Sequence, residues 1–170
     1  MNSTDFLMSL LEDGRTAGMI QSTEAAIIPE LVEFCERTCQ YIIGEMTAFY
    51  EDDVSKTSFV NTSLAWCAFA GIGAVCQWNE DWPSLKKTGV YNALTEPRGL
   101  EEMDEYVLDI IGLSKDKEEC DKFMSFLHDE SAKGVVTISK SQNVFPTFVE
   151  YAKAMYLFGC VFEMNRLGMY

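Results

Sequence analysis

Four glutamates lie where a carboxylate could carry out chemistry. Glu33 and Glu45 fall in one long segment rich in apolar residues, and Glu150 and Glu163 fall in another. A carboxylate that a helix places among large apolar side chains has a raised pKa, and it can transfer protons or bind a metal. Di-metal sites in helical bundles also use a Glu-x-x-His motif, which this sequence lacks. We therefore expect no metal or other cofactor, and we expect these glutamates to reach solvent at the helix edges.

The six cysteines do not follow a metal-binding or redox pattern, because no two of them form a Cys-x-x-Cys pair. Cys35 and Cys39 share one face of a predicted helix with apolar neighbours, and the nearest charges are mostly acidic. Both conditions raise the pKa of a thiol and disfavour the reactive thiolate. The sequence therefore predicts buried structural cysteines. These cysteines, together with the absence of a basic leader pattern at the N-terminus, favour a reducing, cytoplasmic location.

The single histidine, His128, stands between Leu127 and Asp129 near the end of a predicted helix. A Ser-His-Asp triad is assembled in space, so the sequence alone leaves one open. There is no Gly-x-Ser-x-Gly motif and no phosphate-binding loop. We interpret His128 as a surface or capping residue, we assign no catalytic residue, and whether the chain is an enzyme stays open.

Aromatic side chains gather around the least regular segment, residues 79–99. Trp78, Trp82 and Tyr91 lie in or beside it and, with Met103, could line an apolar groove for a peptide, a helix or a small ligand. Binding residues concentrate on loops that a rigid scaffold holds in place. These four residues are the candidate partner or ligand surface. The alternative is a lid of core aromatics over the end of a bundle.

The segment from Ser58 to Trp78 is the predicted central helix, and the helices that carry these residues are expected to pack around it. It contains no charged residue, and a helix that is apolar all round is buried on every side or lies in a membrane. Its polar residues Asn61, Thr62 and Gln77, and the absence of strong basic flanks, favour the buried helix. We expect one all-α domain over residues 1–170, an irregular bundle of about five to seven helices around this central helix.

Apolar periodicity and capping residues predict the other helices. Gly14 and Gly134 are expected to end helices, Ser114 to cap one, and residues 135–139 to form a loop. The expected helices are 3–13, 29–51, a short helix from 83, 100–111, 115–134 and 146–166.

The formal net charge of −14 limits the partners. Such a field repels phosphate backbones and anionic lipids, so we expect neither nucleic acid nor a membrane as a partner. A basic protein is a suitable partner. The favoured hypothesis is an acidic cytoplasmic protein-binding or regulatory domain without catalysis. The alternative is a small-molecule-binding or enzymatic domain with a pocket between the long helices, and a homo-oligomer is compatible with both.

Overall fold

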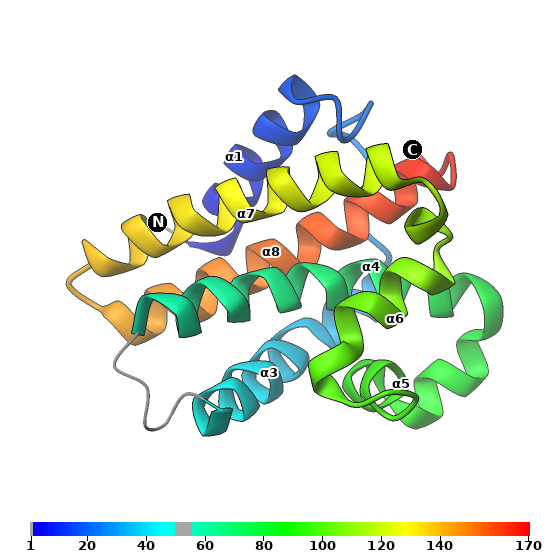
Figure 1. The fold of residues 1–170 in the computed structure, drawn as a ribbon, viewed down its shortest axis with the longest axis horizontal. Coiled ribbons are helices and arrows are strands. Elements are labelled where there is room, and N and C mark those ends of the chain that lie inside the picture. The colour runs from blue at the N-terminus through cyan, green and yellow to red at the C-terminus, as the bar shows by residue number, and fades with distance from the viewer. Residues whose placement is uncertain (1, 50–55) are drawn as a thin grey trace.

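The computed structural model describes residues 2–49 and 56–170, and within them it is all-α, with eight α-helices and no strand. The predicted fold class, an irregular helical bundle around a central helix, is confirmed (Figure 1). The α-helices are α1 (Ser3–Thr16), α2 (Pro29–Glu33), α3 (Cys35–Phe49), α4 (Lys56–Thr88), α5 (Val90–Thr95), α6 (Met103–Ile110), α7 (Lys117–Ser139) and α8 (Val144–Arg166).

Helices α4 and α8 form the centre of the bundle and pack backbone to backbone. A Cβ atom built on Gly71 would lie 1.9 Å from the carbonyl oxygen of Tyr156, and one built on Gly159 would lie 2.1 Å from that of Ala68. Only glycine permits this approach, so Gly71 and Gly159 allow the backbones of the two helices to pack closely.

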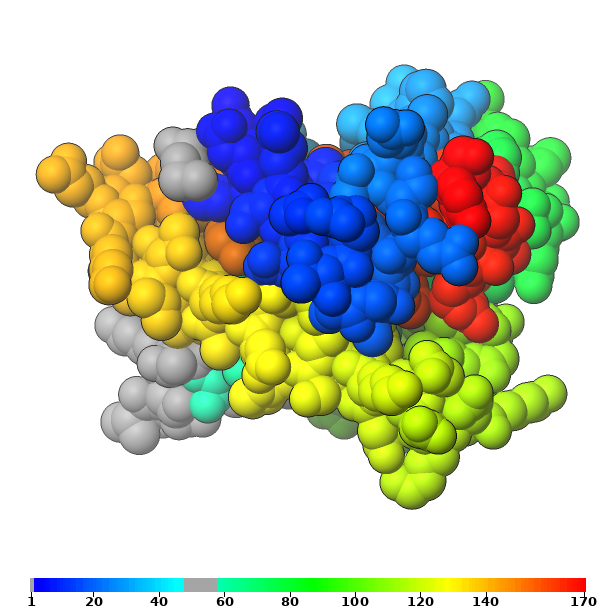
Figure 2. Space-filling model, turned by 90° about the horizontal axis from the view of Figure 1, so that it is seen from above, coloured from blue at the N-terminus to red at the C-terminus, as the bar shows by residue number. Residues whose placement is uncertain are grey.

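The other helices surround this pair. Figure 1 shows α4, α7 and α8 running along the long axis, with α3 on one side of α4 and α5 and α6 gathered at one end. Figure 2 shows α1 and the segment after it lying over the face beside α7. Helix α8 contacts α1, α3, α4 and α7, so most of its apolar surface is covered within one chain, although Val144 and Phe145 at its start are exposed.

Among the described residues, one helix is long and apolar enough to cross a membrane, judged by length and composition alone. It is α4, whose apolar window is mostly buried inside the bundle. The core helix of a water-soluble protein has these same properties, and the burial of α4 agrees with the prediction of a buried central helix.

Helix α4 also extends beyond Trp78, where the central helix was expected to end. Its regular part ends at Asp81, which has φ −159° and ψ 81°. The Asp81 side chain then accepts a hydrogen bond from the Ser84 N–H over 3.2 Å and caps the short helix that was predicted to begin at Pro83. Gly89 ends that helix at φ +86°.

Two predicted glycine stops are wrong, because both glycines permit close packing inside a helix. A Cβ on Gly14 would lie 2.9 Å from the Phe158 ring, and one on Gly134 would lie 2.7 Å from the side chains of Leu64 and Tyr151. Helix α1 therefore continues to Thr16, and residues 135–139 are helical and not a loop.

Helix α1 begins at Ser3 as predicted, whereas the starts of α7 and α8 differ. The N-cap of α1 is Asn2 and that of α7 is Asp116, whose side chains accept hydrogen bonds from N–H groups three residues later. The expected cap Ser114 lies in a 3₁₀ turn. Helix α8 begins at Val144, so Pro146 lies in the first turn, where its missing N–H leaves no bond unmade.

The helix expected from Pro29 to about Glu51 is divided at Phe34 into α2 and α3. The hydroxyl of Tyr156 donates to the carbonyl of Leu31 over 2.9 Å, so a side chain occupies an acceptor that a continuous helix would use itself. The predicted end at Glu51 lies outside the described residues.

Candidate functional site

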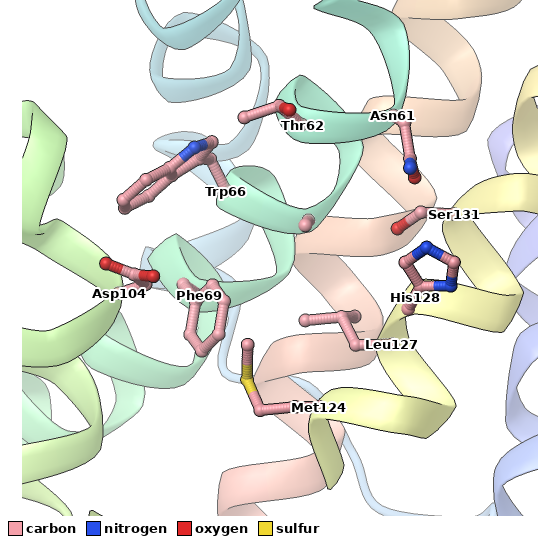
Figure 3. Close-up of a pocket in the computed structure, with 10 residues that line it drawn as sticks. Asn61, Thr62, Trp66, Phe69, Asp104, Met124, Leu127, His128 and Ser131 are labelled. Atoms are coloured by element: carbon pink, nitrogen blue, oxygen red, sulfur yellow. The ribbon is translucent and has the colours of Figure 1, made fainter. Parts of the chain in front are cut away.

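A groove of about 270 Å³ lies between α4, α6 and α7 (Figure 3). Residues spaced three or four apart share a helix face, and this spacing brings one face of α4 opposite one face of α7. The lining residues are Asn61, Thr62, Ala65, Trp66 and Phe69 of α4, Asp104 of α6, and Met124, Leu127, His128 and Ser131 of α7.

The groove is largely apolar, and its rings are held from behind. The Phe69 and Leu127 side chains are almost fully buried. Phe69 packs at 6.2 Å between ring centroids against Trp66, and edge-on at 6.0 Å against the buried ring of Phe123. Edge-on contacts of this kind are favourable and fix ring orientation, so the apolar floor is preformed.

Ser131 places a hydroxyl at this floor without a hydrogen-bond partner among the described residues. Its exposed fraction is 0%, and Figure 3 shows its oxygen directed into the groove, on the side of Asn61. A serine inside a helix often bonds the carbonyl four residues earlier, yet here that bond is not made. An unsatisfied buried hydroxyl costs about 1–3 kcal/mol, which a ligand that bonds to it would recover.

Asp104 supplies the one carboxylate of the groove lining. It lies in the first turn of α6, and its side chain accepts a hydrogen bond from the Glu105 N–H over 2.8 Å. Burial raises the pKa of Asp104, and this N–H opposes that rise. No lysine or arginine of the described residues forms an ion pair with it.

The groove does not contain an assembled triad. His128 is largely exposed, with its Nδ1 atom 3.8 Å from a carboxylate oxygen of Asp129. Ser131 lies one turn away on the same helix but makes no hydrogen bond to His128. A serine nucleophile needs a hydrogen-bonded base, so this arrangement favours binding over acyl transfer.

The four glutamates singled out in the sequence have different surroundings. Glu33 and Glu45 are exposed. Glu150 accepts a hydrogen bond from the Ser3 N–H over 2.9 Å and ties α1 to α8. The expectation that these glutamates reach solvent is wrong for Glu163, which is 2% exposed, and burial raises its pKa although Arg166 pairs with it at 2.7 Å. Within residues 2–49 and 56–170, no three acidic, histidine or cysteine side chains form a metal-ligand set.

The candidate aromatic surface is distributed over several contacts. Met103 is buried in the core, and Trp78 is half-buried. Trp82 packs edge-on against Phe34 at 6.3 Å between ring centroids. Tyr91 packs against Tyr41 at 5.3 Å and lines a small cavity of about 100 Å³ that the other three do not line. Its use as a partner surface stays a prediction.

All six cysteines have free thiols, and all but Cys120 are buried. Burial raises the pKa of Cys39 and of Cys160. A hydrogen bond with Cys39 and then burial raise that of Cys35. The prediction of buried cysteines is confirmed for these three and for Cys67 and Cys76, whereas Cys120 is half-buried.

A second polar cluster, which the sequence did not predict, links α1 to α7. The Lys133 ammonium lies 3.2 Å from carboxylate oxygens of both Asp13 and Glu130, beside a cavity of about 420 Å³. Burial raises the pKa of Glu130 to about 7, and Asp13 contributes while Lys133 opposes the rise. Glu130 and Ser131 share the buried stripe of α7 with Leu127, and this periodicity was the available sequence signal.

Comparison with protein-family models, with curated protein sequences and with solved structures finds no match for this chain. Its function is therefore inferred from its own residues.

Proposed function

We propose that the chain binds a small molecule in the groove between α4, α6 and α7. The observation that carries the proposal is the buried, unpartnered hydroxyl of Ser131 at the floor of a largely apolar groove. Ligand sites are typically apolar hollows in which a few polar groups fix the orientation of the ligand. The groove has this composition, with Ser131 and Asn61 at one side and Asp104 at the other.

The size of the groove favours a small ligand over a docked helix. An α-helix with its side chains is about 10–12 Å wide and needs a long trough, whereas this groove is about 270 Å³ in volume. Since the serine has no hydrogen-bonded base, binding without chemistry is the simpler function.

A neutral phenol tests this proposal. We expect 4-ethylphenol, titrated into ¹⁵N-labelled protein, to shift the amide signals of Ser131 and Trp66 saturably, with a Kd on the order of 1 mM. Ala65→Phe places a ring in the groove and should abolish these shifts. Ala132→Phe adds the same ring on the exposed face of α7 and should leave them unchanged. Identical shifts in both variants, or no saturable shift in the unmodified protein, would refute the proposal.

Docking of a basic protein is a second candidate, consistent with an acidic cytoplasmic protein. Its support is the set of exposed carboxylates Glu96, Glu101 and Glu102 near α6, which have no ion-pair partner among the described residues. Arg98, the nearby cation, pairs instead with Asp109 at 2.7 Å. Replacing the three glutamates by glutamine should remove a salt-sensitive partner from a pull-down. A partner retained equally by both proteins would exclude this surface.

A further inference from the structure

The two sides of the groove carry different chemistry. Figure 3 shows Asp104 on one side, together with the rings of Trp66 and Phe69, and Ser131 with Asn61 on the other. Between them lie the side chains of Met124 and Leu127, which α7 contributes. A ligand that spans the groove therefore meets a carboxylate and aromatic rings at one end and hydrogen-bonding groups at the other.

The side with Asp104 suits a cation. The carboxylate is half-buried and has no lysine or arginine in ion-pair contact within the described residues. Aromatic faces attract a cation through the ring quadrupole, and the attraction increases when water is excluded. The formal net charge of −14 adds a field that draws cations toward the protein.

The side with Ser131 suits a hydroxyl or carbonyl group. The serine hydroxyl can both donate and accept, and the Asn61 amide can do the same. Because the Ser131 hydroxyl is buried without a partner, a ligand lacking a polar group there would leave that cost in place.

We propose that the groove binds an organic amine whose ammonium pairs with Asp104 beside the rings of Trp66 and Phe69, and whose apolar body ends in a hydroxyl or carbonyl at Ser131. This inference rests on the proposed function, because it assigns a ligand class to the same groove. The ammonium belongs to a free small amine, since a groove of about 270 Å³ leaves little room for a polypeptide backbone.

Matched ligands test the ammonium. Tyramine is 4-ethylphenol with an added ammonium, so calorimetric titration of both isolates the contribution of the charge. We expect tyramine to bind about 10- to 100-fold more tightly than 4-ethylphenol. Asp104→Asn should remove this advantage and leave 4-ethylphenol binding unchanged.

Control variants separate local pairing from the general field. Glu105→Gln removes the same charge from the next residue of α6, which does not line the groove, so it should preserve the advantage of tyramine. Phenethylamine lacks the hydroxyl of tyramine and should bind about 10-fold more weakly. Ser131→Ala should remove that difference.

Each alternative result has a definite meaning. If 4-ethylphenol binds but tyramine binds no better, the amine inference is wrong and the proposed function stands. If neither binds, both are wrong. If Asp104→Asn and Glu105→Gln have equal effects, the field of the whole protein attracts the amine and the pairing is refuted. Tighter binding of a capped lysine than of tyramine would refute a free amine in favour of a basic protein.

Discussion

Replacement of Gly159 by alanine should be one of the most damaging single changes to this fold. The added methyl group would lie 2.1 Å from the Ala68 carbonyl oxygen, whereas real Cβ atoms essentially never approach another atom closer than 3.0 Å. The obstacle is backbone, which cannot rotate away as a side chain can. Helices α4 and α8 would therefore have to separate by about 1 Å at their crossing.

The cost follows from what that separation does to the core. A gap of about 0.5–1 Å forfeits a quarter to a half of the dispersion energy of each contact across it. Overpacking against movable side chains costs about 1–3 kcal/mol, and backbone on backbone belongs at or above the upper end. Alanine regains about 1 kcal/mol of helix propensity. The net loss of unfolding free energy is therefore about 2–4 kcal/mol.

Urea unfolding followed by circular dichroism measures this change, and Gly44→Ala is the matched control. Gly44 lies within α3 on an exposed face, and a Cβ built there has no heavy atom within 4 Å. The same substitution should therefore stabilise the protein by about 0.5–1 kcal/mol. An unfolding midpoint for Gly159→Ala equal to that of the unmodified protein would show that α4 and α8 do not pack as closely as described.

Two further predictions concern titratable groups. The raised pKa of Glu130, about 7, means that the fold favours its neutral form. The protonated carboxyl group therefore adds to the free energy of unfolding. This contribution is fully present below the ordinary pKa near 4.5 and is lost as the pH rises through 7. The loss should be about 1–3 kcal/mol between pH 5 and pH 8. Glu130→Gln should flatten this slope in urea unfolding, and an unchanged slope would contradict the assignment. Among the cysteines, Cys120 should react first with a thiol reagent in the native protein, because the other five are buried; rapid labelling of Cys39, found by mass spectrometry of its peptide, would contradict the buried core.

The fold class could be predicted because it depends on patterns within single segments. The apolar circumference of α4 and the periodic stripes of its neighbours are local properties, and they predict a buried helix with others packed around it. Helix ends were less predictable because glycine has two structural roles. Gly18 and Gly89 adopt positive φ values after helices, whereas Gly14 and Gly134 permit close packing within them. Which role applies depends on a partner helix distant in the sequence.

The groove could not be predicted for a related reason. Its faces on α4 and α7 are each visible as a periodic pattern, but the pattern does not state which faces meet. The candidate aromatics Trp78, Trp82 and Tyr91 were chosen because they cluster in the sequence. In the structure, Trp82 packs against Phe34, between α2 and α3, whereas Tyr91 packs against Tyr41 of α3.

Two adjacent polar residues on α7, Glu130 and Ser131, differ in a way that only the tertiary structure reveals. Glu130 and Ser131 both lie on the buried stripe of this helix, where polar side chains are uncommon unless they are paired. Glu130 pairs with Lys133, which offsets part of the cost of burying its carboxylate. Ser131 has no hydrogen-bond partner among the described residues and lies at the floor of a groove. A buried polar group with satisfied bonds is explained by the fold, whereas one left unsatisfied beside a cavity needs a further explanation, and it is the observation from which we propose a ligand.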